Sequence, residues 1–385
     1  MQFIDLAAQQ QKIRADIEAR IKKVLDHGKY VMGPEIAELE TALAEFCGTA
    51  RAVSCSSGTD ALVLALMALD VGPGDAVFTT PFTFVATAEA IALLGASPVF
   101  VDMDPDTFNM DPRALSRAVG AMAAGDPEMH PLPAGWRSLT PRGVLAVDLF
   151  GLPAEYDAIG KIAGQNNLWV VEDAAQAFGA TYHGRRACSL AGIGCTSFFP
   201  AKPLGGYGDG GMCFTDDPAL ADKMESLRIH GQGKKKYENV RIGLNARMDT
   251  LQAAVLLSKF SLFPAELELR RQVAARYTQA LSSSPFVPPK TFGHARSAWA
   301  QYSILCPGLS RDKVVAHLSA RSIPAAIYYP LPLHLQKAFA RQGYKPGDFP
   351  AAETAATRIL SLPMHPYLSN EDQDAVLEAL LSYKE

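Results

Sequence analysis

Between residues 52 and 215 the chain alternates short apolar runs with helical patterns, and this alternation restricts its fold more than any other feature. Apolar runs such as Val144–Asp148 and Leu168–Asp173 are almost continuously hydrophobic. Such strands, separated by helices, are typical of a mostly parallel sheet covered on both faces. The last three strands follow one another closely, so we also expect some antiparallel pairing. The seven expected strands are Ala52–Cys55, Ala76–Thr80, Pro98–Asp102, Val144–Asp148, Leu168–Asp173, Cys195–Phe199 and Gly211–Thr215.

Helical patterns lie before, between and after these strands. With 385 residues, the chain is long enough for two domains. We place the boundary near residue 250, which predicts a large domain, 1–249, and a smaller C-terminal α/β domain, 250–385. The Pro/Gly-rich segment 123–142 is expected to be a surface loop. Helices are expected at Gln9–Asp26, Pro34–Phe46, Thr59–Leu69, Ala86–Leu94, Pro112–Ala121, Thr250–Leu262, Glu266–Leu281 and Lys313–Arg321, with one further strand at Trp299–Leu305.

Composition and charge argue against several classes of protein. The net charge is −4, so the chain lacks the global basic character of a nucleic-acid-binding protein. The six cysteines lack CxxC spacing, which argues against a zinc site. The N-terminus lacks a signal-peptide pattern, and no apolar run approaches the ~18 residues of a membrane span. We therefore expect a soluble cytoplasmic protein. The short basic run Lys234–Lys236 fits a solvated loop or a local anion contact.

The segment Ser56–Leu62 follows a strand and begins an apolar helix. Glycine and hydroxyl residues at a helix N-terminus present free backbone N–H groups, and the helix dipole favours an anion there. The pattern therefore fits a phosphate-binding turn. It fits an ordinary capped turn as well, because Ser, Thr and Asp all cap helices.

Asp173 ends a strongly apolar strand, and Gln176 follows three residues later. In open α/β sheets, ligands bind beyond the carboxyl ends of the strands. A carboxylate at that edge could keep a ring nitrogen protonated, as a pyridoxal cofactor requires. The alternative is that Asp173 caps a helix.

Lys202 lies just past another hydrophobic strand, between Pro200 and Pro203. A partly desolvated lysine has a lowered pKa and becomes nucleophilic, although most lysines are merely solvated. The glycine run that follows contains a formal GxGxxG, at Gly206, Gly208 and Gly211. It leads into a strand instead of a helix, so we reject a dinucleotide site and interpret the glycines as tight turns near a ligand.

Taken together, these segments resemble the DegT/DnrJ/EryC1/StrS family of sugar aminotransferases, a branch of the fold-type-I pyridoxal enzymes. The resemblance extends over nearly the whole chain. Its motifs, in order, are Gly33-Pro34, Ser57–Leu62, Phe82–Thr87, Glu172–Gln176, Ser197–Lys202, Asn245–Ala254, Tyr329-Pro330 with His334, and Leu362–Pro366.

The resemblance implies an α/β fold with a seven-stranded sheet, pyridoxal 5'-phosphate as cofactor and a role for each matching residue. Lys202 would hold the cofactor as a Schiff base and move a proton during catalysis. Asp173 would pair with the pyridine nitrogen, and Gln176 would contact the ring hydroxyl side. The phosphate would be bound by Gly58, Thr59 and Ser197, the ring covered by Phe84, and the substrate contacted by Arg247, Tyr329 and His334.

The family also implies partners. Asn245 would reach the phosphate of a neighbouring subunit's cofactor, which implies a homodimer with shared sites. Pattern alone leaves Asn245 and Arg247 indistinguishable from surface residues. Substrates would be a nucleotide-linked keto sugar and glutamate. The stretch from Lys235 to Gly243, with Arg247, most resembles members that aminate UDP-linked 3-keto sugars, including uronic acids.

Two other functions stay open at this point. One branch of the family carries histidine at the lysine position and dehydrates sugars, whereas Lys202 favours amino transfer. A regulatory protein that keeps only the fold is the other alternative, and the intact Lys202, Asp173 and Gln176 argue against it.

Overall fold

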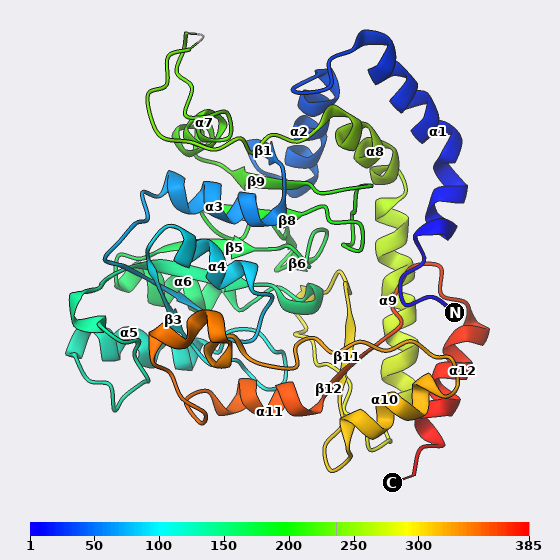
Figure 1. Ribbon diagram of the computed structural model, residues 1–385. Coiled ribbons are helices and arrows are strands. Elements are labelled where there is room, and N and C mark those ends of the chain that lie inside the picture. Colours follow the sequence, from blue (N-terminus) through cyan, green and yellow to red (C-terminus); the bar gives the residue numbers. More distant parts are fainter. Residues whose placement is uncertain (236, 385) are drawn as a thin grey trace.

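The computed structural model describes residues 1–235 and 237–384. Its central feature is a seven-stranded sheet in the order β1-β9-β8-β5-β4-β2-β3 (Figure 1). All seven expected strands are confirmed within a few residues at their ends. Their bounds are β1 Arg51–Cys55, β2 Asp75–Thr79, β3 Ser97–Phe100, β4 Thr140–Val147, β5 Trp169–Asp173, β8 Ile193–Ser197 and β9 Gly211–Thr215.

The sheet is mostly parallel, as expected. Neighbouring pairs from β3 through β8 are parallel, whereas β9 runs antiparallel to both β8 and β1. Parallel strands need long crossover connections, and helices supply most of them. The carboxyl ends of β4, β5 and β8 consequently meet at one edge of the sheet.

Helices cover both faces of the sheet because alternate strand residues point to opposite sides. On one face, α3 (Gly58–Ala68), α4 (Ala86–Leu93) and α7 (Pro218–Leu227) share a core with β1, β5 and β8. On the other face, α5 (Pro112–Ala124) and α6 (Tyr156–Gln165) pack on β2, β3 and β4. Helix α3 is buried on almost all sides, which explains its nearly uniform apolar sequence.

The N-terminal helices α1 (Leu6–His27) and α2 (Pro34–Cys47) lie beside α8 (Thr250–Phe260), as Figure 1 shows. Ala253 and Leu256 of α8 share a core with strands β1 and β9. The C-terminal core begins only at Val273, within α9 (Phe263–Leu281). The division at residue 250 stays a prediction, but the change of packing partners occurs inside α9.

The C-terminal core surrounds a short antiparallel pair, β11 (Tyr302–Leu305) with β12 (Ile359–Leu362). The predicted strand at Trp299–Leu305 and helix at Lys313–Arg321 correspond to β11 and to α10 (Arg311–Ser319). Helices α6, α7, α11 (Pro350–Arg358) and α12 (Asn370–Leu381) were not among those expected from the sequence. Neither were the short strands β6 (Thr181–Tyr182), β7 (Arg185–Arg186) and β10 (Ala295–Arg296).

The surface loop expected at 123–142 is confirmed for residues 125–139, most of which are at least partly exposed. Helix α5 continues to Ala124, and β4 already begins at Thr140. His130 is buried, with Nε2 2.7 Å from the carbonyl oxygen of Phe100, and the amide of Ala134 donates to Gln342 at 2.7 Å. These contacts attach the segment to β3 and to the C-terminal region. Among the described residues, none between 123 and 142 lines the main cavity.

Two further points follow from the described residues. None of their helices is long and apolar enough to span a membrane. The basic run at 234–236 includes Lys236, which lies outside the described residues.

Candidate active site

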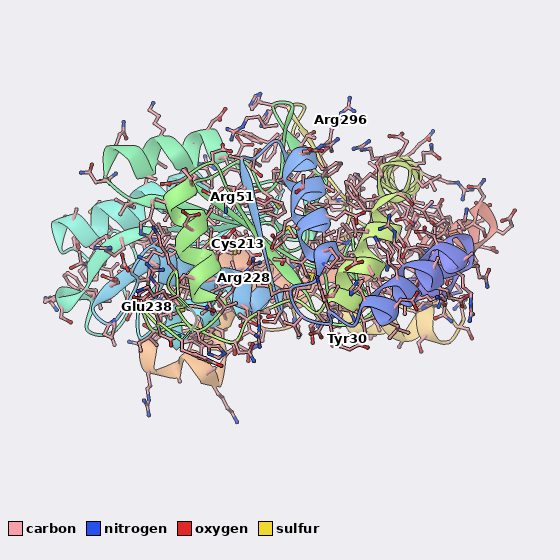
Figure 2. The ribbon with its side chains drawn as sticks, turned by 90° about the horizontal axis from the view of Figure 1, so that it is seen from above. Tyr30, Arg51, Cys213, Arg228, Glu238 and Arg296 are labelled. Carbon is pink, nitrogen blue, oxygen red and sulfur yellow. The ribbon has the colours of Figure 1, made fainter. Side chains whose placement is uncertain are left out.

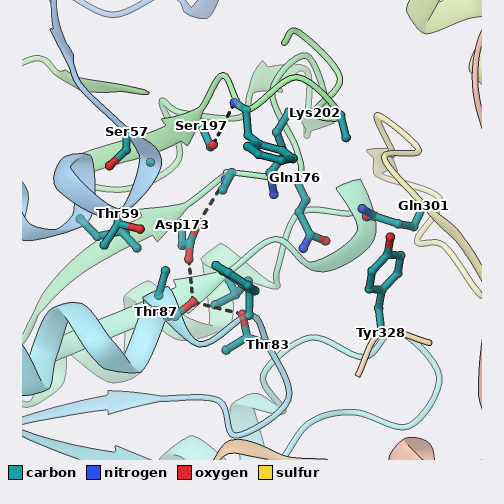
Figure 3. Close-up of a pocket in the computed structure, with 18 of the residues that line it drawn as sticks. Ser57, Thr59, Thr83, Thr87, Asp173, Gln176, Ser197, Lys202, Gln301 and Tyr328 are labelled. Carbon is teal, nitrogen blue, oxygen red and sulfur yellow. Dashed lines mark hydrogen bonds between the residues drawn. The ribbon is translucent and has the colours of Figure 1, made fainter. Parts of the chain in front are cut away.

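A cavity of about 600 Å³ opens at the carboxyl ends of β4, β5 and β8 (Figure 3). Val147, Asp173 and Ser197, the last residues of these three strands, all line it. Parallel strands end at a common edge, so residues distant in sequence meet there. The predicted residues that line the cavity are Gly58, Thr59, Phe84, Asp173, Gln176, Ser197, Lys202 and Tyr329.

One end of the cavity is the N-terminus of α3. Ser57 caps the helix, since its hydroxyl oxygen accepts a hydrogen bond from the amide of Asp60 at 3.0 Å. A Cβ atom on Gly58 would lie 2.5 Å from Cβ of Ser197, so only glycine fits between the helix and the end of β8. Thr59 and Ser197 stand beside it (Figure 3). Helix dipole, backbone N–H groups and hydroxyls together suit a phosphate.

Asp173 lies deeper in the cavity and is only 5% exposed. Thr87 donates to its Oδ2 atom at 2.8 Å, and the amide of Ala175 donates to Oδ1 at 3.2 Å. Burial raises the pKa of Asp173, while these two hydrogen bonds and the charge of Lys202 oppose the rise. A buried carboxylate of this kind favours a cationic partner, such as a protonated ring nitrogen.

Lys202 lies in the turn after β8 and lines the same cavity. Its backbone amide donates to the carbonyl of Phe199 at 2.8 Å, which fixes the turn. Desolvation lowers the pKa of its amine, and the nearby Asp173 partly offsets this. A lowered pKa increases the fraction of uncharged, nucleophilic amine at neutral pH.

The glycines after Lys202 permit close backbone approach, as the sequence predicts. A Cβ atom on Gly205 would lie 2.3 Å from the carbonyl oxygen of Pro200, and one on Gly211 would lie 2.2 Å from that of Ser57. The run leads directly into β9 at Gly211, which agrees with rejecting a dinucleotide site.

The side chain of Gln176 forms hydrogen bonds to residues on both sides of the cavity. Its Oε1 atom accepts from the amide of Phe150 at 2.6 Å, and its Nε2 atom donates to the hydroxyl of Tyr329 at 3.1 Å. One hydrogen of the Gln176 amide is left for a ligand. Burial raises the pKa of Tyr329, which therefore keeps its proton.

Asn245 and Arg247 do not line the cavity of the single chain described here. Asn245 is exposed, and its Oδ1 atom accepts from Nε of Arg247 at 2.9 Å. Their segment is held by Arg228, labelled in Figure 2, whose backbone carbonyl accepts from the amide of Ala246 at 3.0 Å. The Arg228 guanidinium donates to the carbonyl of Ser54 in β1 at 2.8 Å.

His334 lies outside the described lining of the cavity. It is 2% exposed, and its Nε2 atom lies 3.1 Å from Glu353. Its contact with the substrate stays a prediction.

Several residues of the cavity were not singled out from the sequence. Thr87 belonged to the quoted Phe82–Thr87 motif, but only the fold reveals its bond to Asp173. Gln301 and Tyr328 enter the cavity from the C-terminal region, and no pattern in the sequence marks them.

The cavity therefore offers three separate contacts to one phosphorylated aromatic aldehyde. The phosphate cradle, formed by Gly58, Thr59 and Ser197, suits the phosphate of such a molecule. Asp173 suits its ring nitrogen, and Lys202 suits its aldehyde carbon. Such a site at the strand ends of a mostly parallel seven-stranded sheet defines a fold-type-I, pyridoxal-phosphate-dependent aminotransferase. The chain belongs to the DegT/DnrJ/EryC1/StrS aminotransferase family, whose model matches residues 11–381.

Proteins similar in sequence to this chain include a sugar aminotransferase and a regulatory protein. The chain is 45% identical over 382 residues to the UDP-2-acetamido-2-deoxy-3-oxo-D-glucuronate aminotransferase of Pseudomonas aeruginosa, covering 99% of both chains. It is 40% identical to a pleiotropic regulatory protein of Geobacillus stearothermophilus, covering 99% of this chain and 98% of that one.

Solved structures show the same likeness. A DegT/DnrJ/EryC1/StrS aminotransferase from Brucella abortus has a TM-score of 0.93 and 47% identity, covering 99% of this chain and 98% of that one. NtdA from Bacillus subtilis, with the bound cofactor PMP, has a TM-score of 0.85 and 28% identity, covering 98% of this chain and 82% of that one.

Proposed function

We propose that this protein transfers an amino group from glutamate to the keto group of a nucleotide-linked sugar. A UDP-linked 3-keto sugar, including a uronic acid, is the leading substrate class. The product would serve cell-surface polysaccharide or related amino-sugar biosynthesis. The observation that carries the proposal is that Lys202 and Asp173 share one cavity with the phosphate cradle. The name of the Pseudomonas aeruginosa relative supports the substrate class.

Each residue has a defined task. When bound, pyridoxal phosphate supplies a carbonyl carbon that accepts the amino group and a protonated ring that withdraws electrons. The Nζ atom of Lys202 would hold the cofactor and, as a free amine, would move the proton on the reacting carbon of the substrate. The carboxylate of Asp173 would keep the proton on the ring nitrogen. The N-terminus of α3, with Thr59 and Ser197, would bind the phosphate, and the remaining N–H of Gln176 would be available to the ring hydroxyl side.

We further infer a homodimer in which Asn245 of one copy reaches the cofactor phosphate of the other. Asn245 is exposed, and its segment also exposes Val240 and Ile242, at 55% and 88%. Exposed apolar side chains beside an exposed amide that lies outside the described lining of its own chain's cavity suit an interface between copies. Arg247, on the same segment, would then face a substrate bound mainly by the partner.

Amino transfer is tested by mixing the purified, cofactor-loaded protein with glutamate. The visible absorbance should shift as the cofactor takes up the amino group, and a UDP-linked 3-keto sugar should restore it. Lys202→Ala should abolish both changes. A variant that still accepted amino groups at the normal rate would contradict the proposal. Product analysis separates the reactions, since transfer yields an amino sugar and dehydration yields a deoxy sugar.

A further inference from the structure

Gln301 occupies a fixed position on the cavity wall that the C-terminal region provides. The preceding segment crosses closely over Gly151, whose φ is +102° and where a Cβ atom would lie 2.7 Å from the amide of Trp299. The amide of Ala298 donates to the carbonyl of Gly151 at 2.9 Å, and the amide of Gln301 to that of Phe150 at 3.4 Å. The backbone of Gln301 is therefore held against the loop that follows β4.

The side-chain oxygen of Gln301 has no hydrogen-bond donor among the described residues. Its Oε1 atom is buried, although the residue lines the cavity, so a ligand in the cavity can reach this oxygen only when the terminal amide group turns. Because a buried amide oxygen without a partner is unfavourable, a hydrogen bond to a ligand would favour the turned amide.

Tyr328 stands beside Gln301 and presents a second polar group. Figure 3 shows its hydroxyl directed toward the neighbouring side chain of Gln301. Within the described part of the chain, no hydrogen bond of this hydroxyl is found, and burial raises its pKa, so it stays a neutral phenol. The main chain holds Tyr328 in place, because Ala326 pairs with Ser361 of β12 through hydrogen bonds of 3.1 and 2.8 Å.

This wall is neutral. Among the described residues that line the cavity, the charged ones are Asp173, Lys202 and Asp209, and none of these lies in the C-terminal region. A carboxylate would need an arginine or lysine as its partner. An amide and a phenol instead suit a neutral group that both donates and accepts hydrogen bonds.

We propose that Gln301, with Tyr328, forms the subsite for a neutral acetamido substituent next to the carbon that is aminated. The inference rests on the proposed function and narrows its substrate class. Two amides can pair reciprocally, because each offers one N–H donor and one carbonyl acceptor. The substrate named for the Pseudomonas aeruginosa relative carries a 2-acetamido group beside its 3-oxo carbon. Gln301 is thus a specificity-determining residue that favours acetamido over hydroxyl at this position.

The test compares two unreactive nucleotide sugars that differ only in this substituent. Isothermal titration of the cofactor-loaded protein with UDP-N-acetylglucosamine and UDP-glucose gives a ratio of Kd values. We expect the wild-type protein to prefer the acetamido sugar about tenfold, the ratio that one hydrogen bond of ~1.4 kcal/mol provides. Gln301→Leu should lower the ratio to about twofold or less, mainly through weaker binding of the acetamido sugar.

A second variant and a control complete the design. Gln301→Glu keeps the shape of the side chain but removes its N–H donors, and it should lose the preference as well. Gln272→Leu makes the same change on the exposed face of α9 and should keep the wild-type ratio.

The outcomes separate the two proposals. A wild-type protein that binds both sugars without preference, or a Gln301→Leu variant that keeps the full preference, overturns the subsite while leaving amino transfer intact. A wild-type protein that binds neither sugar and takes no amino group from glutamate overturns the proposed function, and the subsite with it.

Discussion

The hydroxyl of Thr87 donates a hydrogen bond to Oδ2 of Asp173 across 2.8 Å. Thr87 lies in the first turn of α4 and Asp173 at the end of β5, so the bond links two elements about the cavity. Thr83 in turn lies 3.1 Å from Thr87, hydroxyl to hydroxyl. These linked hydroxyl groups orient the carboxylate of Asp173. They also stabilise its ionised form, which burial alone would disfavour.

Thr87→Val should raise the pKa of Asp173, because the lost hydrogen bond is one of the interactions that lower it. The acidic limb of the kcat/KM profile should therefore move to higher pH. Hydrogen bonds to charged groups contribute ~1.5–3 kcal/mol, so we expect about a tenfold to hundredfold loss of kcat/KM at neutral pH. The pH dependence of kcat/KM and of the cofactor absorbance measures both effects.

Thr83→Val is the matched control for that variant, since Thr83 contacts Thr87 and not the carboxylate. It should shift the acidic limb much less. Equal shifts in both variants would show that Thr87 does not act through its bond to Asp173.

Gly58→Ala should weaken cofactor binding. The added Cβ atom would lie 2.5 Å from Cβ of Ser197, so the phosphate cradle must widen. We expect the Kd for pyridoxal phosphate to rise about fivefold to a hundredfold, since overpacking costs ~1–3 kcal/mol. Equilibrium titration followed by absorbance measures the Kd. Gly160→Ala, in an open position on α6, should leave the Kd unchanged and the Tm equal or higher.

Tyr329→Phe removes the acceptor for the Gln176 amide. The two side chains are 3.1 Å apart in the native cavity, so the variant leaves a polar hydrogen without a partner. We expect a threefold to tenfold lower rate of amino transfer from glutamate, matching a loss of ~1 kcal/mol. Stopped-flow absorbance measures this rate.

Tyr344→Phe provides the comparison for that variant. Tyr344 is partly buried outside the described cavity lining, and its hydroxyl accepts from the amide of Phe100 at 3.3 Å. Its loss should lower the Tm without changing the rate of amino transfer. A slower rate in this variant would show that the Tyr329 effect reports stability only.

Glu172 gives the stability of the protein a specific pH dependence. It is fully buried next to the buried carboxyl of Asp148, and burial raises the pKa of Glu172 above its ordinary value. The folded protein thus keeps a proton that the unfolded chain releases above its lower pKa. The free energy of unfolding contributed by this group is greatest below the pKa of the unfolded chain and falls as the pH rises through the raised pKa of the folded protein.

Glu172→Gln should remove this contribution, so the Tm of the wild-type protein relative to the variant should fall as pH rises from 5 to 7. The slope is at most ~1.4 kcal/mol per pH unit for one proton. Thermal unfolding across this range measures it. A Tm difference that does not change with pH would show that Glu172 has an ordinary pKa in the folded protein.

Local patterns in the sequence predicted most of the large elements. Continuous apolar runs marked all seven strands, and apolar spacing marked α1 and α2. Helices α6, α7, α11 and α12 were missed. Helix α7, for example, is only ten residues long and has three charged residues among its apolar ones, so its stability depends on packing against α3 and β1. The loop at 123–142 was predicted, but its contacts to Phe100 and Gln342 are tertiary and could not be predicted.

The amino-acid sequence by itself determined the sheet, Asp173 at the end of one strand and Lys202 in the turn after another, because strand hydrophobicity and turn chemistry are local properties. Only the tertiary structure decided which distant side chains complete the site. It brought Thr87 to Asp173 and Tyr329 to Gln176, added Gln301 and Tyr328, and enclosed His334 against Glu353. The Thr87–Asp173 and Gln176–Tyr329 contacts join residues 86 and 153 positions apart, so they depend on how helices and strands pack, and no short stretch of sequence encodes that packing.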